Sequence, residues 1–412
     1  HPHLSGGAMG DRFGVARVFV VGIAIFIVAS LASALAPSPE FLIVARALKG
    51  VGAALMVPGS LALIYRAFPA EERGRAIGVW AAASALTTAL GPILGGAAIT
   101  LLGDETWRWL FAINLPLGVI SIALLWRAVD DDVSHPENGV DIPGAALIAF
   151  GLGAISWALT SGNGTGPWLW AGLAGITGFV FWERIAPHPM LPLGLFRSMS
   201  FSAANLLTFT LYFALSAILF FLPMTVISTW GVSEAEASFA FLPLTLFIAG
   251  LSTRFGAMAD RVGPGPLIGA GAALVALAYA GLGLAAPVQA FWWGVLPAMC
   301  VMGLGMSMVV APLSAAVMGA VTDDAAGAAS GVNNAVSRVA GLVAVAAIGA
   351  MAATVYAGAG GPESFGVESE AAGHAAATAL AFQRIAWVTA ALAALSAAIA
   401  ILGIRAPRAD TP

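Results

Sequence analysis

Twelve long apolar runs divide this chain of 412 residues. Most are about 20 residues or longer, the length that a helix needs to cross a bilayer, and none alternates with the period of two of a barrel strand. Because every backbone polar group in lipid needs an internal partner, such runs predict membrane-spanning helices. The predicted spans are 18–36, 41–65, 75–102, 108–127, 142–161, 167–186, 200–229, 236–257, 265–286, 290–317, 326–357 and 380–404.

The composition opposes the alternative, a very apolar soluble helical protein. Charged residues make up 9% of the chain and hydrophobic residues 60%, whereas soluble domains carry roughly 25% charged residues. The single cysteine, Cys300, falls inside an apolar run, which excludes an intrachain disulfide or a cysteine metal site. We therefore expect an all-α membrane protein.

An internal repeat indicates that the chain contains two copies of one helical unit. GAMGDRFG at Gly7–Gly14 returns as GAMADRVG at Gly256–Gly263, with six of eight positions identical and an offset of 249 residues. KGVG at Lys49–Gly52 matches MGLG at Met302–Gly305 at an offset of 253, and GRAIGV (74–79) matches GAASGV (327–332) at the same offset. Near-constant offsets over three segments are hard to obtain by chance from a composition rich in Gly and Ala alone.

The number of spans between the copies predicts two additional helices. Eight spans separate the two Asp-Arg loops, where two six-span halves would give six, and 142–186 is the natural candidate for the extra pair. Two apolar spans precede the second loop but only six residues precede the first, and the chain starts with His. We therefore expect a fourteen-span protein without its first span and most of its second. The expected domains are an incomplete N-terminal bundle (1–128), a linker with the extra helices (129–198) and a C-terminal bundle (199–406).

The distribution of arginine predicts the orientation of the loops. Cytoplasmic loops of membrane proteins are enriched in Lys and Arg. With the Asp11 and Asp260 loops in the cytosol, twelve arginines fall on the inner side and only Arg108 and Arg384 on the outer side. We therefore expect a multi-pass protein of the cell (inner) membrane. The longest outer loop, roughly 358–378, is rich in Gly, Ala and Glu and is expected to be solvated and mobile.

Four motifs resemble those of the major facilitator superfamily. The loop around Asp11 resembles the signature after its second span, and Arg46–Gly52 resembles its fourth-span motif. GPILGG at Gly91–Gly96 is similar to the fifth-span antiporter motif, and WRWLFAINLP at Trp107–Pro116 is similar to the sixth-span entry of the fourteen-span drug:proton antiporters of the EmrB/QacA type. The resemblance implies two pseudo-symmetric six-helix bundles plus two extra central helices, and export of drugs or other small amphipathic molecules in exchange for protons.

Two cations lie inside one predicted span. Arg46 and Lys49 are three residues apart and therefore share a helical face. A charge at mid-bilayer costs ~2.5–3.5 kcal/mol, so both should meet water, a partner or substrate, although Arg46 could instead reach the membrane interface. The resemblance makes Arg46 the cavity arginine linked to proton coupling. The family usually has Gln where Lys49 stands, so Lys49 either lowers affinity for cationic drugs or favours anionic or zwitterionic cargo.

The repeated Asp-Arg loop is the predicted gate. Its glycines allow a tight turn and close helix approach. A carboxylate there can sit at the N-terminus of a neighbouring helix, worth ~0.3–2 kcal/mol, a bias that a ligand or proton could overcome. A simple solvated turn is the alternative. The gate residues are Gly7, Asp11, Arg12, Gly14 and Arg17 in the first copy and Asp260 and Arg261 in the second.

The antiporter motif has a mechanical interpretation. Pro92 removes one helical hydrogen bond and kinks its span, and Gly91 and Gly95 form a face of small residues for close packing. The resemblance assigns this motif, from Gly78 to Gly96, to sealing the interface between the halves. General packing of membrane helices is the alternative.

Polar residues of the C-terminal half predict a substrate cavity. Arg338 is expected to be buried midway along its span, on one face with Asn334, although a helix–helix polar contact is an alternative. Aromatic residues would add apolar surface for amphipathic cargo. The remaining cavity candidates are Asn205, Phe209, Tyr212, Phe213 and Asn333.

Several activities find no support in the sequence. It has no phosphate loop, ATPase domain or metal-ligand spacing, so we expect no enzyme, no cofactor and no nucleic-acid partner. No predicted span has an Asp or Glu near its middle, and the resemblance places the usual proton-carrying aspartate in the first span. The expected partners are a small-molecule substrate, protons and lipid, with a periplasmic adaptor in a double-membrane bacterium. A metabolite uniporter or importer and a non-transporting fragment are the alternatives.

Overall fold

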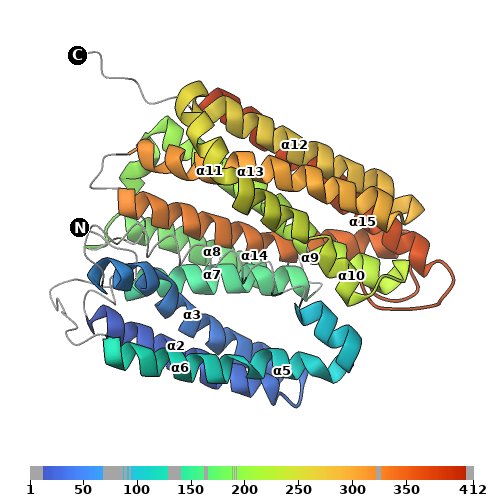
Figure 1. Cartoon of the computed structure of the whole chain (residues 1–412), viewed down its shortest axis with the longest axis horizontal. Coiled ribbons are helices and arrows are strands. Elements are labelled where there is room, and N and C mark those ends of the chain that lie inside the picture. The colour runs from blue at the N-terminus through green and yellow to red at the C-terminus, as the bar shows by residue number, and fades with distance from the viewer. Residues whose placement is uncertain are drawn as a thin grey trace. The chain divides into compact units, whose positions relative to one another are not determined.

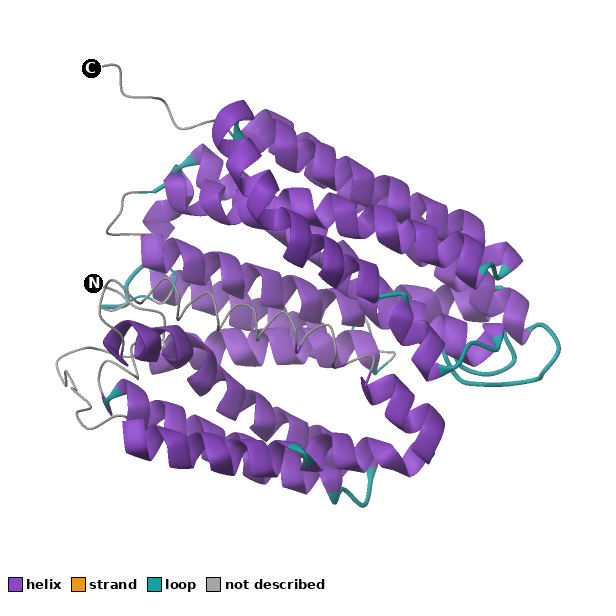
Figure 2. Ribbon diagram, in the orientation of Figure 1, coloured by secondary structure: helices purple, strands orange, loops and turns teal. Residues whose placement is uncertain are grey.

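The computed structural model describes residues 13–67, 87, 91, 94–128, 141–161, 166–187, 189, 191, 193–321 and 326–404. These residues form helices joined by loops, and none of them lies in a strand (Figures 1 and 2). Nine helical stretches of this described part are long and apolar enough to cross a membrane. The predicted all-helical membrane fold is confirmed.

The described helices follow the predicted spans. Eleven of the twelve predicted spans coincide with a helix or a closely joined helix pair, whereas 75–102 lies largely outside the described residues. The main helices are α2 (Val15–Ala34), α3 (Pro39–Ala67), α5 (Trp107–Ala112), α6 (Asn114–Ala128), α7 (Ile142–Thr160), α8 (Pro167–Glu183), α9 (Met199–Trp230), α10 (Glu234–Phe239), α11 (Leu242–Val262), α12 (Pro264–Ala285), α13 (Leu296–Gly319), α14 (Ala326–Gly358) and α15 (His374–Gly403). Short 3-10 or π turns lie at Asp104–Thr106, Leu193–Arg197, Ala286–Val288 and Phe291–Val295.

Two compact units divide the chain. The first comprises His1–Ala145 and Ala186–Met190, and the second comprises Ala146–Ile185 and Leu191–Pro412. In the first unit, α2 packs against α3, α5 and α6. In the second unit, α12 packs against α13 and α15, and α9 packs against α14 and α15. The core of the second unit is mainly apolar, with Tyr279, Phe382, Leu207 and Met299 fully buried, and it also buries polar side chains such as Asn205.

The two copies of the repeat share one helix crossing. A Cβ placed on Gly52 of α3 would lie 2.8 Å from the carbonyl oxygen of Gly22 on α2. A Cβ on Gly305 of α13 would lie 2.6 Å from the carbonyl oxygen of Gly271 on α12. These glycines differ by the sequence offsets of 249 and 253, so the α2–α3 and α12–α13 pairs are structural counterparts. Only glycine permits backbones to approach this closely.

Helices α7 and α8 form a tight pair of their own. A Cβ on Gly151 would lie 2.9 Å from the backbone nitrogen of Ile176, and one on Gly172 would lie 2.8 Å from the carbonyl oxygen of Gly151. Small residues thus bring the two backbones into contact, as is common between membrane helices.

The long loop between α14 and α15 is tied down. It spans residues 359–373, because α15 starts six residues earlier than predicted. The Tyr356 hydroxyl lies 2.6 Å from His374 Nδ1 and accepts a hydrogen bond from the Glu363 backbone nitrogen at 3.2 Å. The Phe365 ring packs against Tyr356 and Phe221. The glutamates of the loop are exposed, as a solvated loop requires, but these contacts oppose the expected mobility.

Candidate functional site

The predicted cation pair lies on one side of α3. Arg46 is exposed and Lys49 is half-buried. The Lys49 Nζ lies 4.6 Å from the ring centre of Phe26 on α2 and 4.8 Å from that of Phe111 on α5. The Arg46 guanidinium carbon lies 5.8 Å from the Phe111 ring centre. Three helices of the first unit therefore build one cluster of two cations and two aromatic rings, which we call the cation–aromatic cluster (Arg46, Lys49, Phe26 and Phe111).

Aromatic faces partly stabilise these cations but do not neutralise them. A cation within about 6 Å of a ring centre gains ~0.5–2 kcal/mol, depending on its solvation. Within the described part of the chain, neither Arg46 nor Lys49 forms an ion pair or a side-chain hydrogen bond. The cluster therefore carries an excess of positive charge and has free donors for an anion.

The corresponding positions of the second repeat are apolar. At the same offsets, Met299 and Met302 replace the two cations, Val275 replaces Phe26, and all three are fully buried. The same helix crossing at Gly271 and Gly305 persists there. The α12–α13 pair therefore packs closely without any charge at these positions, and the cations are a specific feature of the first unit.

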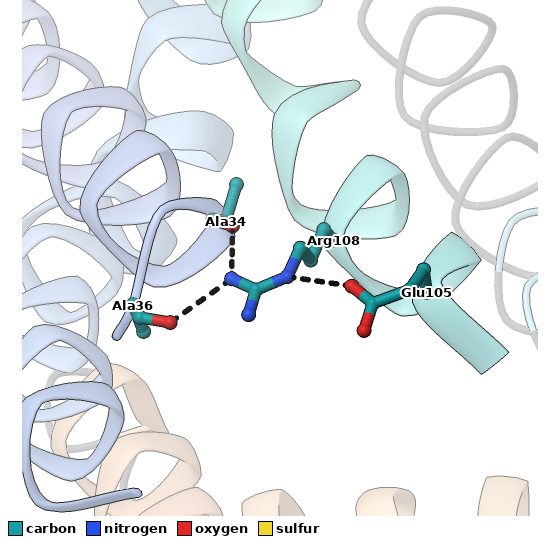
Figure 3. A network of polar contacts seen from close by, with 4 residues as sticks. All are labelled: Ala34, Ala36, Glu105 and Arg108. Carbon is teal, nitrogen blue, oxygen red and sulfur yellow. Dashed lines mark hydrogen bonds and ion pairs between the residues drawn. The ribbon is translucent and has the colours of Figure 1, made fainter. Parts of the chain in front are cut away.

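Arg108 holds the end of α2 against α5 (Figure 3). Its Nη1 donates to the carbonyl oxygens of Ala34 and Ala36, both at 2.9 Å, and its Nε donates to Glu105 at 3.0 Å. Its guanidinium also lies 4.5 Å from the Trp107 ring centre. Carbonyls at a helix C-terminus have no partner within the helix and attract cations.

These Arg108 bonds, which we call the Arg108 clasp, fix the position of α5 against α2. They thereby help to place Phe111 of the cation–aromatic cluster, which lies one helical turn after Arg108 on α5. The second unit has a similar arrangement, in which Gln383 of α15 donates to the carbonyl oxygen of Gly283 on α12 at 3.0 Å. Gly283 and Ala34 differ by the offset of 249 residues. From the sequence, Arg108 is predicted only to lie at the outer face. Its bonds to the end of α2 are not predicted, although Arg108 belongs to the WRWLFAINLP motif.

The predicted cavity residues of the second unit separate into two groups. Asn205 on α9 is 3% exposed, and Asn333 on α14 donates to Asn205 Oδ1 at 3.3 Å and to Thr208 Oγ1 at 2.7 Å. These bonds favour a helix–helix polar contact for both asparagines. Phe209 and Phe213 are partly buried on α9, with ring centres 6.1 Å apart, and Tyr212 between them is partly buried as well.

The expectation that Arg338 is buried midway along its span is wrong. Its side chain is exposed, not buried, and so is that of Asn334. Arg338 follows Asn333 by five residues, which is about 140° around a helix, so it points away from the face of α14 that meets α9. The Asn334 amide bonds back to its own helix, at the carbonyl oxygen of Ser330.

The gate loops are described only in part. Gly7, Asp11 and Arg12 lie outside the described residues. Gly14 precedes α2 with φ 96°, and its counterpart Gly263 precedes α12 with φ 85°, which explains why glycine recurs at this position. Arg17 is exposed on the first turn of α2.

The second copy of the gate is helical. Asp260 and Arg261 belong to the last turn of α11, not to a loop, and Arg261 is exposed. Helix α11 ends at Val262, because Gly263 leaves the helical conformation with φ 85° and ψ 149°, and Pro264 follows it.

The antiporter motif also lies partly outside the described residues, including Gly78 and Pro92. A Cβ on Gly91 would meet nothing within 4 Å, and one on Gly95 would lie 3.7 Å from the Leu110 side chain, an ordinary contact. Gly96 is buried. The expected close packing through Gly91 and Gly95 is therefore not found among the described residues.

The fold and the cluster define a multi-pass membrane protein with a duplicated helical unit and, as far as the described residues extend, two cations without an ion-pair partner in one of its helices. The sequence matches the model of the Major Facilitator Superfamily over residues 4–345. The chain belongs to the Major Facilitator Superfamily.

Curated relatives and solved structures agree with this family assignment. The chain is 32% identical to the Methylenomycin A resistance protein of Streptomyces coelicolor, over 83% of this chain and 73% of that protein. It is 30% identical to the Multidrug resistance protein Stp of Mycobacterium tuberculosis, over 85% of this chain and 66% of that protein. Across four such relatives the chain spans 61% to 78% of their length. A bacterial homolog of the human lysosomal transporter Spinster has the same fold, with TM-score 0.69 and 16% identity over 98% of this chain and 86% of that one.

Proposed function

We propose that this protein is a secondary active transporter that exports drugs or other small amphipathic molecules in exchange for protons. The observation that carries the proposal is that relatives named for antibiotic and multidrug resistance match more than four fifths of the chain at 30–32% identity. Two duplicated helical units are the architecture on which alternating access depends, because one bundle can rock against the other around a fixed midplane site.

Arg46 suits a role in proton coupling. Its charge is not neutralised within the described part of the chain, and it lies inside α3. A cation lowers the pKa of any carboxyl group that approaches it, so movement of a proton-carrying acid toward or away from Arg46 would release or take up a proton. In this proposal Arg46 acts on the proton carrier, and the substrate binds in the same region.

The finer classification is part of the same proposal. We infer a fourteen-span drug:proton antiporter of the EmrB/QacA type, in which α7 and α8 are the two extra helices. Its domains would be an N-terminal bundle (1–128), a linker with the extra helices (129–198) and a C-terminal bundle (199–406). It would reside in the cell (inner) membrane with the Asp11 and Asp260 segments in the cytosol, together with a periplasmic adaptor in a double-membrane bacterium.

Replacing Arg46 with Ala tests this function. We expect Arg46→Ala to abolish export driven by a proton gradient, because the charge that tunes the proton carrier is lost, while membrane insertion is unchanged. The measurement is accumulation of amphipathic fluorescent dyes of three charge types, cationic, neutral and anionic, in inside-out vesicles with an acidified lumen. Arg127→Ala, which removes an exposed cation at the end of α6, is the matched control and should transport normally. Undiminished transport by Arg46→Ala would exclude Arg46 from the mechanism.

A further inference from the structure

The charge in the cation–aromatic cluster is not required by the fold. The second repeat builds the same crossing with Met299, Met302 and Val275, all 0% exposed. A cation within a membrane-spanning helix is costly, whereas methionine is not. Two cations at this place, with no neutralising partner among the residues that the structure describes, therefore indicate a ligand rather than a structural need.

The geometry of the cations defines the charge of that ligand. Arg46 and Lys49 share a face of α3, and neither has an ion-pair or hydrogen-bonding partner in the described part of the chain. A guanidinium binds a carboxylate through two parallel hydrogen bonds, and an ammonium adds a point charge with three donors. A carboxylate is therefore the group that fits both side chains at once.

The two rings define the remainder of the ligand. Lys49 already lies over Phe26 and Phe111, so these faces are not free to attract a cationic drug, which Lys49 and Arg46 would also repel. Both rings are partly exposed, and the parts that Lys49 does not cover can pack against a flat apolar body whose carboxylate reaches the cations. The ligand class is thus an aromatic carboxylate.

We infer that the cation–aromatic cluster is a binding site for small aromatic carboxylates, and that the protein exports organic anions of this kind. The inference rests on the proposed export function, but the binding step can be tested without transport. Arg46 and Lys49 hold the carboxylate, and Phe26 and Phe111 hold the aromatic body.

The test uses three probes of one shape and different charge. Binding of 1-naphthoate, 1-naphthylmethylammonium and 1-naphthalenemethanol to the full chain in phosphatidylcholine nanodiscs would be measured by calorimetry. We expect 1-naphthoate to bind more tightly than the other two. Lys49→Gln should weaken 1-naphthoate binding about 10-fold or more, because one charge-assisted hydrogen bond is lost, and should leave the neutral probe unaffected. Lys49→Arg should retain most of the affinity.

Two further variants separate local from general effects. Phe111→Leu should weaken both 1-naphthoate and 1-naphthalenemethanol, since it removes a packing surface and not a charge. Arg127→Gln, which removes a cation elsewhere in the same unit, should change neither. Thermal unfolding of each variant would show that it is folded.

Three outcomes would overturn the inference. The first is tighter binding of the cationic probe than of 1-naphthoate, and the second is equal affinity of Lys49→Gln and the unsubstituted protein for 1-naphthoate. The third is loss of 1-naphthoate binding when phosphatidylglycerol is added to the nanodisc, which would assign the cluster to a lipid headgroup. Lys49-dependent binding of 1-naphthoate without proton-driven efflux of any probe would instead support the site and contradict the proposed export function.

Discussion

At the scale of single residues, the roles of the arginines and the lysine depend on their partners. The spacing of Arg46 and Lys49 alone predicts that they share a face of a membrane helix. Phe26 and Phe111, the rings that lie over Lys49, could not be predicted, because they come from two other helices. Asn333 shows the same limit, since its partners Asn205 and Thr208 lie 128 and 125 residues away.

Arg108 offers a test at this scale. Arg108→Gln removes charge-assisted hydrogen bonds to Ala34 and Ala36, so we expect the free energy of unfolding to fall by about 1–3 kcal/mol. The measurement is thermal unfolding of the purified protein in detergent. Arg384→Gln is the control, because Arg384 is exposed and makes no ion pair or hydrogen bond in the described part of the chain. Equal stability of the two variants would show that the clasp contributes nothing.

At the scale of helices, glycine positions decide which pairs pack closely. The two glycines of KGVG look alike in the sequence but differ in the structure. A Cβ on Gly52 would lie 2.7 Å from the backbone nitrogen of Phe26, whereas one on Gly50 would meet nothing within 4 Å. Their counterparts in the second repeat are both closely packed, since a Cβ on Gly303 would lie 2.9 Å from the carbonyl oxygen of Pro243.

This difference gives a matched pair of substitutions. Gly52→Ala forces α2 and α3 apart and should destabilise the protein by about 1–3 kcal/mol. Gly50→Ala should cause no loss, because the added methyl group meets no neighbour and alanine favours the helix by up to about 1 kcal/mol. Thermal unfolding of both variants, side by side, is the measurement. A larger loss for Gly50→Ala than for Gly52→Ala would contradict the described crossing.

At the scale of the whole molecule, the repeat is structural as well as sequential. Glycine crossings, the glycines that precede α2 and α12, and the bonds that hold α2 and α12 at their ends all recur at offsets of 249 or 253 residues. Charge does not recur, because the second repeat has Met299 and Met302 at the positions equivalent to Arg46 and Lys49. The two units thus share a scaffold, and only the first carries cations at these two positions.

The orientation in the membrane can be tested with single cysteines. In a Cys300→Ala background, Glu368→Cys in the outer loop should react with a membrane-impermeant maleimide on intact cells. Arg127→Cys, at the end of α6, should react only after the cells are permeabilised, because positive residues are retained on the cytosolic side. Both residues are exposed, so accessibility alone does not distinguish them. The opposite labelling pattern would reverse the proposed topology.

The sequence by itself determined the helical membrane fold, the positions of eleven described helices or helix pairs, the duplication and the shared face of Arg46 and Lys49. These features are local or periodic, since apolar length, helical spacing and a repeated motif are all properties of the chain alone. Only the tertiary structure decided that Phe26 and Phe111 lie over Lys49, that Arg108 binds the end of α2 74 residues away, and that Arg338 is exposed. Such contacts depend on how helices cross, and the crossing is set by the packing of side chains from distant segments.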